Sequence, residues 1–121
     1  MKKKILIVED ETDLLAMLEI KAKNDGYDCF VDTVGDQAIN LATENTPNII
    51  LLDMMLPQIS GLGILRSLKN NDTLKKIPVI IFSALGDKYV IEEAIDIGAS
   101  AYFIKGGNMH ELFDTIKKHV A

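Results

Sequence analysis

The stretch Ile49-Ile50-Leu51-Leu52-Asp53 places a carboxylate directly after four consecutive aliphatic residues. A nearly continuous run of Ile and Leu is typical of a parallel strand that is covered on both faces of its sheet. An ionised aspartate at the end of such a strand needs partners, because burying an unpaired charge is costly. This stretch therefore predicts a central strand that ends at a charged site.

Four other short apolar runs lie on either side of this strand in the sequence, at residues 5–8, 27–31, 77–82 and 101–104. The segments between consecutive runs are too long for hairpins and long enough for crossover helices. Five strand–helix units predict an α/β domain in which five helices cover both faces of a doubly wound parallel sheet. The chain has 121 residues, which suits one domain spanning residues 1–121.

Capping residues and apolar stripes predict where the helices begin and which faces they bury. Thr12 or Asp13 is the expected N-cap of the first helix. In the fourth helix, the expected buried stripe consists of Ile91, Ala94 and Ile95.

Composition and charge exclude several classes of protein. The formal net charge of -5 argues against direct binding of nucleic acid, which needs a basic surface. No apolar run approaches the roughly 20 residues that a membrane-spanning helix needs, so we expect no membrane insertion. The single cysteine, Cys29, cannot form an internal disulfide, and a reducing, cytoplasmic location is the simplest interpretation.

Polar and charged side chains follow the ends of four of the five predicted strands. They are Glu9, Asp10, Asp53, Ser83 and Lys105. The carboxyl ends of parallel strands share one edge of a sheet, where ligands bind in folds of this class. Two carboxylates ~5 Å apart repel each other by roughly 3 kcal/mol at an effective dielectric constant of ~20. A lysine and a divalent cation would offset this repulsion, and oxygen ligands in a shallow cleft favour Mg²⁺.

This set of side chains matches the needs of phosphoryl transfer to a carboxylate. A carboxylate can attack phosphorus and form an acyl phosphate. The transferred group carries charge on three oxygens, and Mg²⁺, Lys105 and Ser83 would supply the cations and the hydroxyl that contact them. Asp53 is the best candidate for the nucleophile, because it follows the central strand and has acidic neighbours to hold the metal.

At these residues the sequence resembles the receiver (REC) domain of bacterial-type two-component response regulators. The matching motifs are Ile5-Leu-Ile-Val-Glu9-Asp10, Leu51-Leu-Asp53-Met-Met-Leu-Pro57 with Gly61 following, Ser83-Ala84, and Tyr102-Phe-Ile-Lys105. Each motif alone is weak, but the four in this order and spacing are specific. The resemblance implies a flavodoxin-like sheet with strand order 2-1-3-4-5.

The resemblance also implies a role for each matching residue. Asp53 would be the phosphoacceptor, taking a phosphoryl group from a sensor histidine kinase or a phosphotransfer protein. Asp10, Asp53 and the backbone carbonyl of Met55 would bind Mg²⁺, and Glu9 would act mostly through water. The domain would catalyse its own phosphoryl transfer and slow self-dephosphorylation without being a conventional enzyme.

The resemblance further implies a switch. Lys105 would contact a phosphoryl oxygen, Ser83 would move to bond the phosphoryl group, and Tyr102 would turn inward into the space vacated. The face formed by the fourth helix, the fifth strand and the fifth helix would then bind an output domain or a downstream protein.

The sequence departs from the family pattern at two places. Gly106-Gly107 stands where members usually have a proline after the lysine, so we expect a trans bond or a turn that glycine permits. Met55 and Leu85 are apolar at positions beside the site where polar residues are common.

Three alternative functions remain open from the sequence. One is a pseudo-receiver that serves only as an interaction surface, which the intact acidic set disfavours. A second is a phosphohydrolase with an aspartyl nucleophile, which would need a second Asp at the position of Met55. A third is a flavodoxin, but Glu9-Asp10-Glu11 is electrostatically wrong for a phosphate-binding loop.

Overall fold

Five strands alternate with five helices in the computed structural model, which describes residues 2–120. The strands are β1 (Lys4–Val8), β2 (Asp28–Asp32), β3 (Ile49–Leu52), β4 (Val79–Ser83) and β5 (Ala101–Ile104). The helices are α1 (Thr12–Asn24), α2 (Ala38–Asn45), α3 (Gly61–Lys69), α4 (Lys88–Ile97) and α5 (Met109–His119). Each predicted apolar run overlaps one strand, so the predicted element order is confirmed.

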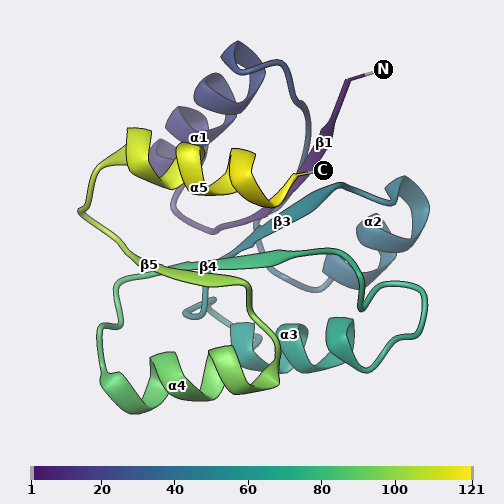
Figure 1. Cartoon of the computed structure of the whole chain (residues 1–121), viewed down its shortest axis with the longest axis vertical. Coiled ribbons are helices and arrows are strands. Elements are labelled where there is room, and N and C mark those ends of the chain that lie inside the picture. The colour runs from purple at the N-terminus through teal and green to yellow at the C-terminus, as the bar shows by residue number, and fades with distance from the viewer. Residues whose placement is uncertain (1, 121) are drawn as a thin grey trace.

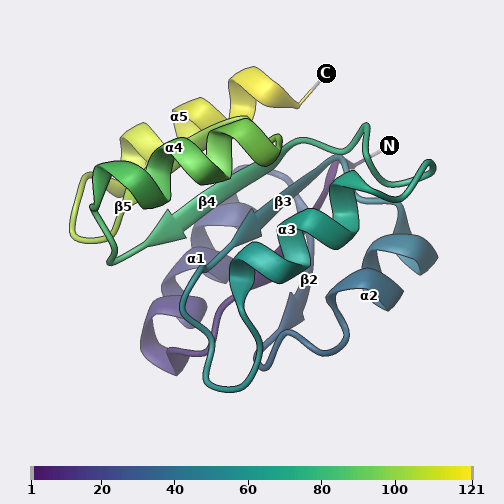
Figure 2. The same ribbon diagram turned by 90° about the horizontal axis from the view of Figure 1, so that it is seen from below.

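The strands form one parallel sheet in the order β2-β1-β3-β4-β5. Helices α1 and α5 cover one face of this sheet, while α2, α3 and α4 cover the other (Figures 1 and 2). The doubly wound α/β fold and the strand order implied by the resemblance are therefore confirmed. No helix within residues 2–120 is long and apolar enough to cross a membrane.

The core divides into two apolar layers, one on each face of the sheet. Alternate residues of the strands contribute to opposite layers, as the two-residue period of a strand requires. On β3, Ile50 and Leu52 pack with α2, α3 and α4, whereas Ile49 and Leu51 pack with α1 and α5. All four side chains are at most 1% exposed, which explains why this strand is aliphatic on both faces.

Backbone pairing continues one residue past the ends of three strands and fixes the residues that follow. The amide of Asp53 donates to the carbonyl oxygen of Val8 at 3.0 Å, and that of Lys105 donates to Ser83 at 2.8 Å. The amide of Glu9 donates to the carbonyl oxygen of Asp32 at 3.1 Å. The residues at the carboxyl edge of the sheet are therefore placed by the sheet itself.

The predicted N-cap of α1 is wrong by one or two residues. Glu11, not Thr12 or Asp13, is the N-cap, and its side chain makes no capping hydrogen bond. The carbonyl oxygen of Glu11 accepts the first helical bond from the amide of Leu15 at 2.8 Å. The side chain of Glu11 is thus available for another contact.

The predicted buried stripe of α4 is also partly wrong. Ala94 is fully buried, but Ile95 is 44% exposed. The side chains that pack with Ala94 are those of Val90 and Ile97. The sequence places apolar residues around most of this helix, so the pattern alone did not identify the buried face.

The start of α3 lies directly against the chain that leaves β3. The amide of Gly61 donates to the carbonyl oxygen of Met54 at 3.1 Å. A Cβ atom at Gly61 would collide with the carbonyl oxygen of Asp53 and would lie 2.5 Å from the Cα atom of Met54. Only glycine allows this approach, which closes the loop that carries Asp53.

We expect Gly61→Ala to destabilise the protein by about 2 kcal/mol or more, because the colliding atoms are backbone and cannot move aside easily. Gly63→Ala is the matched control in the same helix, since the nearest atom to its added Cβ would be 3.9 Å away. That variant should gain about 0.5–1 kcal/mol from the higher helix propensity of alanine. Urea unfolding measures both, and similar midpoints for the two variants would contradict the steric argument.

Candidate functional site

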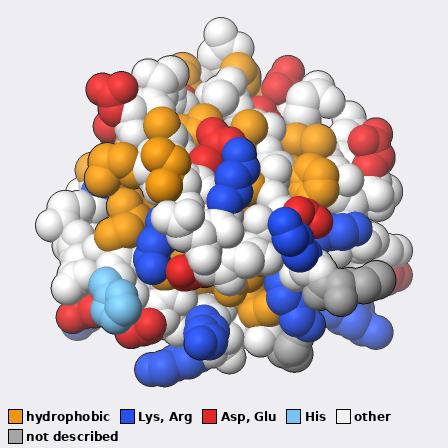
Figure 3. All heavy atoms as spheres, turned by 90° about the horizontal axis from the view of Figure 1, so that it is seen from above, with side chains coloured by type: hydrophobic (Ala, Val, Ile, Leu, Met, Phe, Trp, Pro, Cys, Tyr) orange, Lys and Arg blue, Asp and Glu red, His pale blue; other side chains and the backbone are white. Residues whose placement is uncertain are grey.

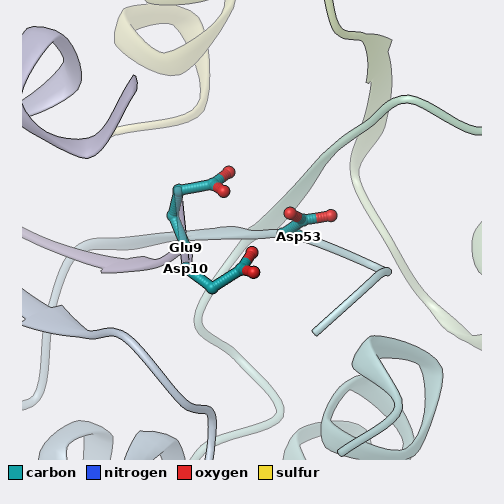
Figure 4. Close-up of side chains that lie close together, drawn as sticks. All are labelled: Glu9, Asp10 and Asp53. Carbon is teal, nitrogen blue, oxygen red and sulfur yellow. The ribbon is translucent and has the colours of Figure 1, made fainter. Parts of the chain in front are cut away.

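Three carboxylates meet at the carboxyl edge of the sheet. Glu9 and Asp10 follow β1, and Asp53 follows β3, as Figure 4 shows. One carboxylate oxygen from each residue can be chosen so that all three lie within 4.8 Å of one another. Glu9 is 1% exposed and Asp53 2% exposed, while Asp10 is only partly buried. The acidic cluster predicted from the strand ends is therefore present and can hold a metal ion.

The ammonium group of Lys105 lies among these acids and makes three ion pairs. Its Nζ atom is 2.8 Å from Oδ2 of Asp53 and 3.1 Å from Oε1 of Glu9. It is also 3.1 Å from Oε1 of Glu11, whose side chain is 63% exposed. A lysine ammonium has three N–H donors, so the three carboxylates use all of them.

Burial and hydrogen bonding act in opposite directions on these charges. Burial is the main cause that raises the pKa of Glu9 to about 7, although hydrogen bonds from the Glu11 amide and from Lys105 act to lower it. Burial also acts to lower the pKa of Lys105. Its hydrogen bonds to Asp53, Glu9 and Glu11 outweigh that effect, and the pKa of Lys105 is raised above its ordinary value.

The remaining predicted site residues lie on the loop after β3 (Met55), at the end of β4 (Ser83) and on β5 (Tyr102). The amide of Met55 donates to Oδ1 of Asp53 at 2.9 Å, which places the Met55 backbone next to that carboxylate. The hydroxyl oxygen of Ser83, which is fully buried, accepts a hydrogen bond from the amide of Leu85 at 3.2 Å. The Tyr102 hydroxyl donates to the carbonyl oxygen of Leu85 at 2.6 Å. This bond connects β5 to the loop that follows β4.

The loop after Lys105 adopts the turn that its glycines permit. No peptide bond within residues 2–120 is cis, and Gly106 has a φ of 93°. Non-glycine residues rarely adopt this left-handed conformation. The trans bond expected between Lys105 and Gly106 is therefore confirmed.

Sequence reasoning missed one member of the site. Glu11 is not among the site residues that the sequence predicts. Its contact with Lys105 joins residues 94 positions apart in the chain, which no local pattern reveals. The one local signal is the residue type, because an N-cap is usually Asp, Asn, Ser or Thr. A Glu at this position indicates that its side chain contacts something other than the helix amides.

Comparisons with known proteins agree with this geometry. The family model of the response regulator receiver domain matches residues 5–117. The chain is 39% identical over 114 residues to the response regulator ArlR of Staphylococcus saprophyticus, covering 94% of this chain and 50% of ArlR. It is 35% identical over 120 residues to the sporulation initiation phosphotransferase F of Bacillus subtilis, covering 99% of this chain and 95% of that protein.

A solved structure gives the same result. The receiver domain of the Francisella response regulator 1452 superposes with a TM-score of 0.90 at 26% identity, covering 98% of this chain and 96% of that one. The chain belongs to the response regulator receiver domain family, whose members act in phosphorylation-dependent signalling. It spans about half the length of ArlR and nearly the whole length of the sporulation phosphotransferase.

The raised pKa of Glu9 predicts how stability depends on pH in the metal-free protein. Glu9 has a pKa of about 7 when folded, against an ordinary value of 4.5, so the folded state binds more protons between these values. The contribution of Glu9 to stability is therefore complete below about pH 4.5 and is lost as pH rises through about 7. Urea unfolding in EDTA between pH 5 and 8 should show a flatter pH profile for Glu9→Gln than for the wild type.

Glu44→Gln is the control, because it removes an exposed carboxylate on α2. Its profile should keep the wild-type slope. An unchanged slope in Glu9→Gln would show that another group controls the pH dependence.

Proposed function

We propose that Asp53 is the phosphoacceptor of this receiver. The observation that carries the proposal is a carboxylate that is 2% exposed, bonded to a lysine at 2.8 Å and grouped with two further acids. In the transfer, an oxygen of Asp53 forms a bond to phosphorus while the bond between phosphorus and the donor's leaving group breaks. The leaving group departs with the electron pair, and the product is an acyl phosphate.

The acidic cluster is the proposed site for Mg²⁺. Carboxylate oxygens on a partly open edge of a sheet are the ligands that Mg²⁺ prefers. Asp10 and Asp53 would bind it directly together with the carbonyl oxygen of Met55, and Glu9 would act through water. When bound, the ion would neutralise charge on the transferred phosphoryl group.

Lys105 and Ser83 are the proposed contacts to the phosphoryl group from this chain. The Lys105 ammonium already lies against Asp53, so it is in place to contact an oxygen of a group attached there. The Ser83 hydroxyl accepts from the amide of Leu85, and its own hydrogen can rotate toward an anion. A movement of Ser83 would disturb Leu85, whose carbonyl oxygen accepts from Tyr102.

The face formed by α4, β5 and α5 is the proposed contact with an output domain or downstream protein. Tyr89 on α4 is 80% exposed and Ile104 on β5 is 48% exposed, which leaves apolar surface without a cover. Exposed apolar side chains also lie on the side covered by α1 and α5 (Figure 3), where Met17 and Ile20 are 58% and 62% exposed. We prefer the α4–β5–α5 face because Tyr102 on β5 is bonded to Leu85, which lies beside the site.

The proposed donor of the phosphoryl group is a sensor histidine kinase or a phosphotransfer protein.

Labelling with a small phosphodonor tests the function. With acetyl phosphate or phosphoramidate and Mg²⁺, the wild type should form one acid-stable, hydroxylamine-sensitive phosphoryl group, and Asp53→Asn should form none. Omitting Mg²⁺ should also prevent labelling. Asp36→Asn, which removes an exposed acid after β2, is the control and should label normally. Normal labelling of Asp53→Asn would contradict the assignment.

We further expect the phosphorylated state to be long-lived. Hydrolysis needs a water molecule held in line with the phosphorus–oxygen bond that breaks. Met55, 54% exposed beside the site, and the partly buried Leu85 cannot hold that water by hydrogen bonds from their side chains. Met55→Asn/Leu85→Glu should lose phosphate about five- to tenfold faster, the rate equivalent of one net hydrogen bond of about 1–1.4 kcal/mol.

The measurement is the half-life of the acyl phosphate in Mg²⁺. Met17→Asn makes the same exchange of an exposed methionine on α1 and should leave the half-life unchanged. A double variant as slow as the wild type would show that water access is controlled elsewhere.

A further inference from the structure

Two features of Glu11 are not expected of a surface acid that contacts only water. It is the N-cap of α1, where Ser, Thr, Asp and Asn are preferred because their short side chains bond the first helical amides. The Glu11 side chain makes no such bond and extends to Lys105 instead, with Oε1 3.1 Å from Nζ. The backbone of Glu11 is fixed at the same time, because its amide donates to Oε2 of Glu9 at 3.1 Å.

The three partners of Lys105 differ in what their release would cost. Its three N–H donors are used by Asp53, Glu9 and Glu11, so a contact with a phosphoryl oxygen requires one of these bonds to open. The side chains of Glu9 and Asp53 are each 2% exposed, and opening either bond would leave a buried carboxylate without its cation. The side chain of Glu11 is 63% exposed, so water can replace the lysine there.

We propose that Glu11 occupies one N–H of the Lys105 ammonium before phosphorylation and gives it up to the incoming phosphoryl group. Glu11 is therefore a competitor of the phosphodonor for one N–H of Lys105. This inference rests on the proposed role of Asp53 and adds to it a residue that sets how readily the site takes a phosphoryl group. Lys105 itself stays in place through its bonds to the two buried acids and its position 5.9 Å from the centre of the Phe82 ring.

Glu11→Gln tests the competition, because the amide keeps the size of the side chain and removes the charge that binds Lys105. Beryllofluoride with Mg²⁺ serves as a phosphoryl analogue whose binding involves no phosphoryl transfer. Its dissociation constant should fall about two- to fivefold in Glu11→Gln, the range that corresponds to losing one exposed ion pair. With acetyl phosphate, the concentration that gives half the maximal labelling rate should fall by the same factor, while the rate at saturation changes by less than twofold.

Asp13→Asn is the matched control for charge. Asp13 is an exposed acid in the first turn of the same helix, and within residues 2–120 its side chain makes no hydrogen bond or ion pair. Removing its charge weakens the general repulsion of an anionic donor by a similar amount but leaves Lys105 untouched. Asp13→Asn should therefore change the dissociation constant of beryllofluoride, and the acetyl phosphate concentration for half-maximal labelling, by less than half of the change seen in Glu11→Gln.

The outcomes separate this inference from the function on which it rests. Tighter beryllofluoride binding in Glu11→Gln than in Asp13→Asn supports the competition. Equal shifts in the two variants would overturn it in favour of long-range charge, and weaker binding in Glu11→Gln would show that Glu11 assists the phosphoryl group. A wild-type protein that neither binds beryllofluoride nor labels would overturn the proposed function and this inference with it.

Discussion

The sharing of one ammonium group among three carboxylates is the interaction on which the site depends. Two of these acids, Glu9 and Asp53, are almost inaccessible to water, and neither would be tolerated as an unpaired charge in a core of this kind. Lys105 supplies the compensating charge from the end of β5, which is an edge strand, whereas β1 lies near the opposite edge of the sheet. The long lysine side chain therefore extends past the ends of β4 and β3 to contact Glu9.

This arrangement explains why the fold and the site are inseparable. The aliphatic strands bury the chain on both faces, which removes water from the residues at their ends. The missing water raises the pKa of Glu9 and strengthens each contact made by Lys105. The glycine at position 61 then brings the start of α3 against the Asp53 backbone. A cluster of acids on a loop would have neither the desolvation nor the fixed geometry.

The architecture could be predicted from the sequence because short aliphatic runs, which are recognisable locally, determine how the whole sheet is arranged. Aliphatic runs on a spacing that fits crossover helices identify the strands, and parallel strands must bring Asp10, Asp53 and Lys105 to one edge. Local preferences did not predict the structure where several residues were equally suited to be buried. In α4, isoleucines occur on more than one side, and only packing against the sheet selected Val90 and Ile97 over Ile95. The role of Glu11 depends on a rotamer and a distant partner, which a sequence does not encode locally.

The continuation of the backbone ladder past the strand ends has a consequence for how the protein moves. The amides of Glu9, Asp53 and Lys105 are bonded to neighbouring strands, so exchanging their hydrogens with solvent requires the sheet itself to open. These amides should be protected nearly as strongly as those in the middle of β3. Slow exchange of the Asp53 amide hydrogen would mean that signalling proceeds without local unfolding there. The rearrangement would instead be confined to side chains and to the loops that carry Met55 and Leu85.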